Sequence, residues 1–206
     1  MISATCPPAK VSAKPVPASG PPRPIFCYGT LMAPQVYGTV MGKPQPIGRS
    51  AVLKGFRRVK VIDATYPAMF RVDHPSAEVR GVLVPVESHD DLRLLDAFET
   101  DDYERTTVTV TITNDNGQEV KTEADTYLWA APESLLLPDE PWSYEDFLRD
   151  RMDEWMSNEE VFYGNTGTPP ISVDHPHGEH IVLAAKELDR IRQERKAAAD
   201  SSSGRH

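Results

Sequence analysis

Two short stretches of the sequence hold residue types that could do chemistry. The first is the turn formed by Tyr28, Gly29, Thr30 and Leu31, which follows the apolar run at residues 25–27. Gly29 can take backbone angles that are closed to other residues, and it lets another group approach the main chain. If the N–H groups of this turn converge, they form a concavity that attracts a carboxylate or a carbonyl oxygen. On the pattern alone, a plain glycine turn is the simpler interpretation.

The second stretch is LLDAFETDDYERTTV, residues 94–108, in which Glu99 ends a predicted helix beside Asp101 and Asp102. The carbonyl groups at a helix C-terminus disfavour a negative charge, and neighbouring carboxylates act in the same direction. If Glu99 also points inward, burial adds to both effects. Such a carboxylate could exchange protons near neutral pH, as a general acid/base must. Spacing alone favours the alternative, an exposed acidic helix end.

The elements that must position these stretches are mostly strands. Alternating apolar residues and turn signals predict strands over 25–28, 50–62, 68–72 and 79–86, and a hairpin over 105–129 that turns at Asn116-Gly117. Helical patterns lie over 33–42, 88–98 and 143–156, and Ser88 with Asp91 forms a capping-box-like start. We therefore expect an α+β fold, a small mixed β-barrel or curled sheet with helices packed outside.

Composition divides the chain into three parts. Residues 1–24 are rich in proline without a hydrophobic period, which predicts a disordered leader. Residues 25–165 form the expected folded domain, and residues 166–206 a C-terminal loop, a surface helix and a disordered tail. Only Leu188 and Ile191 are apolar between Lys186 and Lys196, a stripe that we expect to be too thin to bury much.

The bulk charge excludes several classes of function. The chain has 206 residues and a formal net charge of −9, from 22 basic and 31 acidic side chains. This balance argues against nucleic acid as a partner, because phosphate neutralisation needs a basic face, and equally against an anionic membrane surface. No apolar run approaches the roughly 18 residues of a membrane span. Cys6 and Cys27 predict no disulfide framework, so we expect reduced thiols in a cytoplasmic protein. The tails identify no protein partner.

Two further stretches have the composition of a chemical site without its context. The segment DHPHGEH, residues 174–180, contains metal-ligating residue types. Pro176 and Gly178 make it a loose loop, and no second cluster completes a site, so we expect solvated histidines and no metal. Cys27 lies beside the turn, but no histidine is adjacent in sequence, and its strand position indicates a small buried side chain rather than a nucleophile.

FCYGTLM followed by LDAFETDDYERTTV resembles the gamma-glutamylcyclotransferase-like superfamily, and within it the plant and fungal avirulence-induced-gene-like branch. The resemblance covers residues 25–130 and implies a compact barrel with helices outside. It implies that Tyr28, Gly29, Thr30 and Leu31 cradle a gamma-glutamyl unit, largely through main-chain N–H groups, and that Glu99 is the acid/base. Arg105 would give structural support. The residues that the resemblance places along the walls of the substrate cavity are Tyr66, Pro67, Tyr103 and Tyr127.

The implied activity is that of a gamma-glutamylcyclotransferase, which releases 5-oxoproline from a gamma-glutamyl amine or amino acid by intramolecular aminolysis. The reaction needs no cofactor. The leaving group stays open between an amino acid, a free amine, a lysine side chain and the cysteinylglycine of glutathione. One departure is Thr100, at a position where the branch commonly has glycine. The alternative function is a non-catalytic small-ligand-binding or interaction protein that retains the same cavity.

Overall fold

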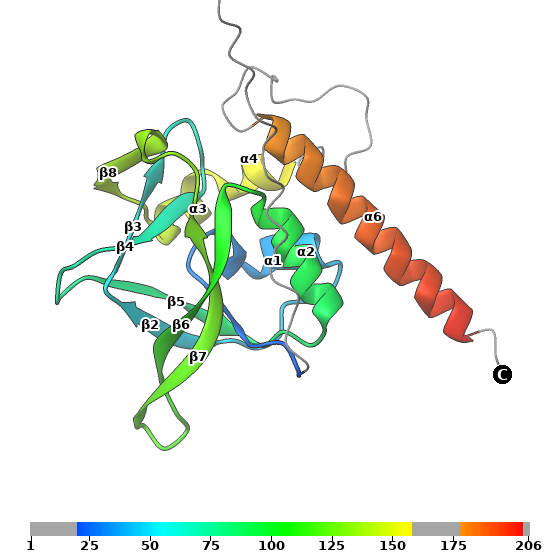
Figure 1. Cartoon of the computed structure of the whole chain (residues 1–206), viewed down its shortest axis with the longest axis horizontal. Helices are drawn as coiled ribbons and strands as arrows, with labels where there is room; N and C mark the ends of the chain where they lie inside the picture. The colour runs from blue at the N-terminus through cyan, green and yellow to red at the C-terminus, as the bar shows by residue number, and fades with distance from the viewer. Residues whose placement is uncertain (1–19, 158–177, 204–206) are drawn as a thin grey trace, which may run out of the picture.

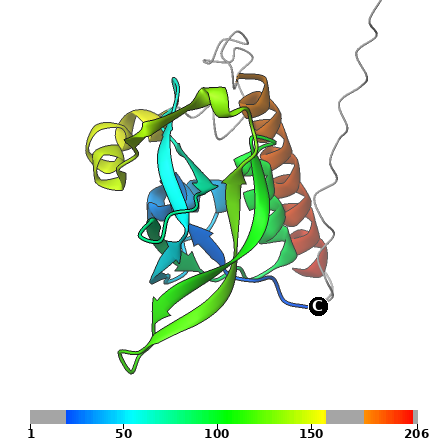
Figure 2. The same ribbon diagram turned by 60° about the vertical axis from the view of Figure 1, so that its left-hand side comes forward.

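A closed five-stranded barrel forms the centre of the molecule. The structure is a computed structural model that describes residues 20–157 and 178–203. The barrel has the strand order β1-β5-β2-β6-β7, formed by β1 (Ile25–Cys27), β5 (Glu78–Val84), β2 (Arg49–Lys54), β6 (Tyr103–Thr113) and β7 (Glu119–Trp129). Strand β1 pairs antiparallel with β5 and parallel with β7, which closes the barrel. The β6–β7 hairpin extends beyond the other strands (Figure 2).

A second sheet and several helices surround this barrel (Figure 1). The sheet has the order β4-β3-β8, formed by β4 (Pro67–Arg71), β3 (Phe56–Val61) and β8 (Leu136–Pro141). The α-helices are α1 (Pro34–Met41), α2 (His89–Glu99), α3 (Tyr144–Asp150), α4 (Met152–Ser157) and α6 (Gly178–Ser203), and the short 3-10 helices are η1 (Thr30–Met32) and η2 (Glu133–Leu135). The predicted α+β barrel with outer helices is confirmed.

Local sequence signals set several element boundaries. The side chain of Ser88 accepts a hydrogen bond from the N–H of Asp91, and the Asp91 carboxylate accepts one from the N–H of Ser88, so α2 begins with the expected capping box. The hairpin turns over residues 114–118, as Asn116-Gly117 predicts. Two predictions were wrong in detail, and one strand was missed. The expected strand over 50–62 is two strands, the expected helix over 143–156 is divided at Arg151, and β8 was not foreseen.

Gly55 divides the predicted strand between the two sheets. Its φ of +79° is a conformation that other residues rarely adopt. The N–H of Gly55 donates to the carbonyl of Ala77, and its own carbonyl accepts from the N–H of Val72. The chain therefore turns from β2 in the barrel into β3 in the second sheet, and β3 reaches the region above the Tyr28–Leu31 turn.

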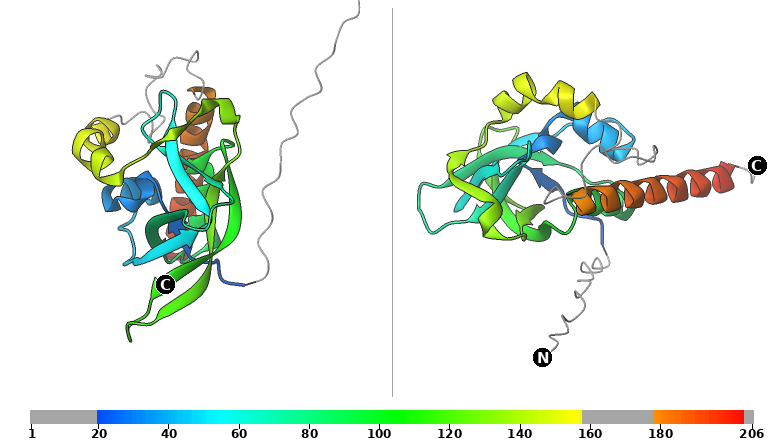
Figure 3. Two further views of the ribbon diagram at one scale, coloured as in Figure 1. Left: turned by 90° about the vertical axis from the view of Figure 1, so that its left-hand side faces the viewer. Right: turned by 90° about the horizontal axis from the view of Figure 1, so that it is seen from above.

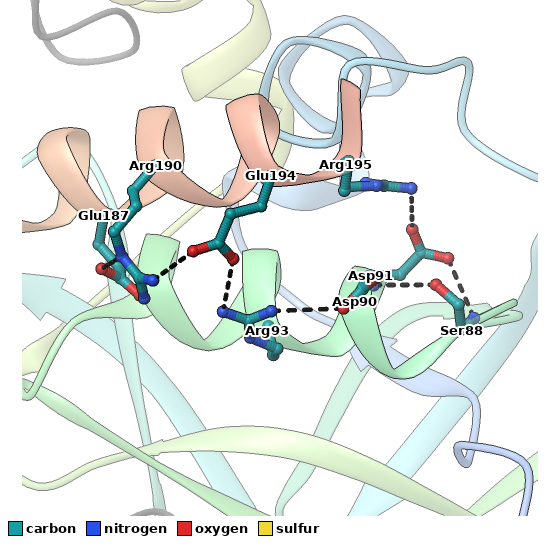
Figure 4. A network of polar contacts seen from close by, with 8 residues as sticks. All are labelled: Ser88, Asp90, Asp91, Arg93, Glu187, Arg190, Glu194 and Arg195. Carbon is teal, nitrogen blue, oxygen red and sulfur yellow. Dashed lines mark hydrogen bonds and ion pairs between the residues drawn. The ribbon is translucent and has the colours of Figure 1, made fainter. Parts of the chain in front are cut away.

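The C-terminal helix corrects the prediction of a surface helix with little buried. In α6, Leu188 and Ile191 are each only 1% exposed and join the apolar cluster between the barrel and its helices. The thin stripe is buried because α6 packs along α2, while its far end projects away from the barrel (Figure 3). Ion pairs flank this contact. Arg195 lies 2.9 Å from Asp91, and Arg93 on α2 lies 3.2 Å from Glu194 (Figure 4).

Several predictions fall on other parts of the chain. The proline-rich leader to residue 19 and the segment 158–177, which includes most of the His-rich stretch, lie outside the described residues. Residues 20–24 lead into β1, and the Pro24 carbonyl accepts a hydrogen bond from the N–H of Asp125 on β7. No helix in the described ranges is long and apolar enough to span a membrane.

Candidate active site

The Tyr28–Leu31 turn connects β1 to the short helix η1. Within η1, the N–H groups of Met32 and Ala33 donate to the carbonyls of Gly29 and Thr30, each at 3.0 Å. The first N–H groups of a helix have no acceptor inside it, so those of Thr30 and Leu31 are not used by η1. Both residues are buried, main chain and side chain together.

Strand β4 crosses the turn at close range, and this approach explains the glycine. A Cβ atom on Gly29 would lie 3.0 Å from Cγ and 3.1 Å from Cδ of Pro67. The Tyr103 hydroxyl donates to the Pro67 carbonyl at 2.8 Å, and the rings of Tyr66 and Tyr103 meet edge to face at 6.5 Å. The fold thus brings three segments that are distant in sequence, at residues 29, 66–67 and 103, to one place.

The other two predicted tyrosines are tied to the same region by their hydroxyl groups. Tyr28 donates to the main-chain carbonyl of Tyr127 at 2.6 Å, and the Tyr127 hydroxyl donates to the Asp96 carboxylate at 2.8 Å. Both tyrosines are nearly fully buried. Their polar ends are therefore engaged by the protein, and their rings form the apolar surroundings of the turn.

Glu99 is the last residue of α2, is half-buried, and lies within electrostatic reach of these groups. Burial raises the pKa of the Cys27 thiol and of the Tyr28 phenol, and the negative charge of Glu99 raises both further. Burial is also the main cause that raises the pKa of the phenols of Tyr66, Tyr103 and Tyr127. The negative charge of Glu99 raises the pKa of each of these phenols further. The structure therefore groups Glu99 with the turn and with the four tyrosines named from the sequence.

An ion-pair network that sequence reasoning missed fixes the end of α2. Asp96, one helical turn before Glu99, lies 2.8 Å from Arg105 and accepts the hydroxyl of Tyr127. Arg105 also lies 3.2 Å from the buried carboxylate of Asp125 on β7. These contacts hold the C-terminal end of α2, close to Glu99, against the β6–β7 hairpin. The contacts of Arg105 are those of a supporting residue.

The residue after Glu99 has an unusual main-chain conformation. Thr100 has φ 61° and ψ −168°, a combination that is almost restricted to glycine and is strained for a β-branched residue. Its Oγ1 accepts a hydrogen bond from the N–H of Asp102 at 3.2 Å. The sequence carried a signal for this strain, because the resembling branch commonly has glycine here. The conformation turns the chain from α2 into β6 immediately after Glu99.

Arg58 of β3 is a second residue that sequence reasoning missed. Its Nη1 donates to the carbonyl of Tyr28 at 2.6 Å, and its guanidinium lies 5.0 Å from the ring centroid of Trp142. No sequence signal distinguishes Arg58 from Arg57 beside it, because only the tertiary fold places β3 against the turn.

A metal site has no candidate in the described ranges, since they contain no group of three or more His, Cys, Asp or Glu side chains that could hold an ion.

Comparisons with known proteins identify related sequences. A family model described as "Gamma-glutamyl cyclotransferase, AIG2-like" matches residues 25–144. AIG2-like protein C of Arabidopsis thaliana is 28% identical over 145 residues, which cover 70% of this chain and 80% of the relative. Protein AIG2 C of the same plant is 32% identical over 123 residues, which cover 60% of this chain and 70% of the relative. The solution structure of At5g39720.1 from Arabidopsis thaliana has 30% identity and a TM-score of 0.48, and the match covers 70% of this chain and 93% of that one. The chain belongs to the Gamma-glutamyl cyclotransferase, AIG2-like family.

Proposed function

We propose that this chain is a gamma-glutamylcyclotransferase, which releases 5-oxoproline from a gamma-glutamyl amine or amino acid. The observation that carries the proposal is the position of Glu99. A half-buried carboxylate at the end of α2 lies within electrostatic reach of a turn whose first N–H groups are not used by η1. The family description names the same activity. The cytoplasmic location and the lack of nucleic-acid and membrane partners stay predictions.

The proposed reaction is an internal acyl transfer. The α-amine of the substrate attacks its own γ-carbonyl carbon, a C–N bond closes the five-membered ring, and the amide C–N bond to the leaving amine breaks. Because nucleophile and electrophile belong to one molecule, little entropy is lost in bringing them together. The protein must still fold the substrate, move protons and stabilise the developing oxyanion.

The site residues divide this work. The N–H groups of Thr30 and Leu31 would donate to the oxyanion as charge develops on the γ-carbonyl oxygen. Glu99 would take a proton from the substrate ammonium and return one to the leaving nitrogen. The buried tyrosine rings would keep water away and hold the substrate in its folded conformation. The ammonium loses two protons as it becomes the ring N–H of 5-oxoproline. One of them passes through Glu99 to the leaving nitrogen, and the departing amine takes up the second and becomes an ammonium ion.

Substitution of Glu99 tests the proposal. We expect Glu99→Gln to lower turnover by about 10²–10⁴-fold, the usual contribution of a general acid/base. The matched control is Asp101→Asn, which makes the same change from carboxylate to carboxamide at an exposed residue two positions away. It should leave turnover unchanged. Release of 5-oxoproline is measured with gamma-glutamyl amino acids, gamma-glutamyl amines and glutathione, and melting temperatures establish that each variant is folded.

The results separate two functions. Release by the wild type and the control but not by Glu99→Gln supports the enzyme, and the best substrate names the leaving group. A folded Glu99→Gln variant with wild-type turnover refutes the role of Glu99. Binding of 5-oxoproline by the wild type without any release would indicate the non-catalytic ligand-binding protein.

A further inference from the structure

Arg58 differs from the other half-buried basic side chains of the protein. Four of these have a carboxylate within ion-pair distance, at 2.9, 2.8, 3.7 and 2.9 Å, namely Lys43, Arg105, Arg192 and Arg195. Arg58 is also half-buried, yet it forms no ion pair with any residue that the structure describes. Charged groups that are removed from water are normally paired with an opposite charge. An arginine placed in this way is suited to an anion that comes from outside the chain.

The contacts of Arg58 leave much of its guanidinium available. Nη1 makes both of its polar contacts, to the Tyr28 carbonyl at 2.6 Å and to the Met32 sulfur at 4.0 Å. A guanidinium carries five N–H donors, and the described residues provide no acceptor for those on Nε and Nη2. Neither of these two nitrogens is among the fully buried side-chain atoms that lack a partner, so both retain some access to solvent.

The group remains a cation in this position. Burial lowers the pKa of Arg58, while the charge of Glu145 raises it, and an arginine begins from a value far above neutral. Glu145 acts from beyond ion-pair distance, so it does not occupy the guanidinium. The ring of Trp142, 5.0 Å from the guanidinium carbon, restricts the orientation of its plane.

The charges around the turn require such a cation if the ligand is a gamma-glutamyl compound. After burial, the charges of Asp102 and Glu99 both raise the pKa of the Tyr66 phenol, so two carboxylates lie in this region. A gamma-glutamyl unit has an α-carboxylate of its own, which these charges would repel. Main-chain N–H groups alone would offset that repulsion only in part.

We propose that Arg58 binds the α-carboxylate of the gamma-glutamyl unit, while its bond to the Tyr28 carbonyl holds the turn in place. The inference rests on the proposed function, because it specifies how that site holds its substrate. Arg58 binds the carboxylate and Glu99 binds the ammonium group, and both groups are attached to the same α-carbon of the substrate. The two opposite contacts orient the amine toward the γ-carbonyl. The protein therefore selects compounds that have a free α-carboxylate.

Ligand pairs that differ only in this carboxylate test the inference. Binding of 5-oxoproline is compared with binding of 2-pyrrolidinone, the same ring without the carboxylate, by titration calorimetry. We expect the wild type to prefer 5-oxoproline by about 10- to 100-fold, as for a hydrogen bond to a charged group. Arg58→Met keeps an unbranched side chain against Trp142 and should lose most of this preference. Arg58→Lys keeps the charge and should retain an intermediate preference.

The matched control is Arg71→Met. Arg71 of β4 also lies 5.0 Å from an aromatic ring, that of Phe56, but it has no contact with the turn among those described. This variant should keep the wild-type preference. Melting temperatures are measured for all variants, and Arg58→Lys carries the test if Arg58→Met does not fold.

The outcomes distinguish this inference from the proposed function. A wild type that binds the two ligands equally, or a folded Arg58 variant with the full preference, overturns the inference even if 5-oxoproline is released from substrates. Loss of the preference in Arg58→Met supports it even if no turnover is found, in which case only the proposed function fails. With an active enzyme, Arg58→Met should raise KM for the gamma-glutamyl substrate more than it lowers kcat.

Discussion

Replacement of Thr100 tests whether strain is stored beside Glu99. Two variants, Thr100→Gly and Thr100→Ala, both lose the hydroxyl that accepts a hydrogen bond from the N–H of Asp102. They differ in how they suit a φ of 61° with a ψ of −168°. Glycine adopts this conformation freely, whereas alanine retains a Cβ atom and therefore keeps most of the strain.

The expected magnitude follows from two opposing effects. A non-glycine residue in such a conformation costs of order 1–3 kcal/mol. Glycine costs about 0.4–1 kcal/mol relative to alanine because it gives the unfolded chain more freedom. The lost hydrogen bond is common to both variants and cancels. Thr100→Gly should therefore be more stable than Thr100→Ala by about 1 kcal/mol, the reverse of the usual order.

Urea unfolding and thermal melting measure this difference. For a domain of this size, about 1 kcal/mol corresponds to a difference in melting temperature of about 2–4 °C. An alanine variant as stable as the glycine variant, or more stable, would refute the strained conformation. If the strain also positions Glu99, Thr100→Gly should lower kcat while KM changes little.

Two further predictions concern stability. The pKa of the buried Asp91 is lowered below 3.8, because contacts with Lys43, Ser88 and Arg195 together outweigh burial, which acts in the opposite direction. A lowered folded-state pKa adds stability above the unfolded value that is lost as pH falls. Asp91→Asn should therefore be less stable than the wild type in urea at pH 7, and the two curves should approach each other below about pH 4. Equal stability at neutral pH would contradict this. Gly81→Ala would place a Cβ atom 2.3 Å from a main-chain oxygen of β1. We expect a loss of about 1–3 kcal/mol from such overpacking. Gly38→Ala in α1, where the nearest atom is at 3.6 Å, should instead raise the melting temperature. A Gly81→Ala variant as stable as Gly38→Ala would show that β1 and β5 are not so close.

Features that depend on neighbours in sequence could be predicted. The capping box of α2 and the Asn116-Gly117 hairpin are short patterns whose own backbone groups complete them. The Tyr28–Leu31 turn and Glu99 are also visible locally, as a glycine after a strand and an acid at a helix end, but only the family resemblance gave them a role in a site. The family resemblance then placed the tyrosines around them, and the structure groups these residues.

Features that depend on distant partners could not be predicted. Strand β8 has the sequence LLPDEP, and only pairing with β3 makes a strand of this proline-containing, acidic segment. Arg58 and Asp96 look like ordinary charged residues until the fold places them against Tyr28 and Arg105. A glycine inside a strand pattern is typical of a bulge or bend, but the change of sheet at Gly55 follows only from the two sheets that it joins.

The docking of α6 shows that the residues matched by the family model and the residues that pack together as one fold are not the same set. The family match ends at residue 144, but one of the cationic partners of Asp91 is Arg195, and α6 also supplies buried apolar side chains to the cluster beside α2. A chain ended after the match would contain the turn, Glu99 and Arg58, but it would leave a buried carboxylate with less compensation and one side of α2 uncovered. Inactivity of such a shortened chain would report a helix that has lost its support. It would say nothing about which residues are catalytic.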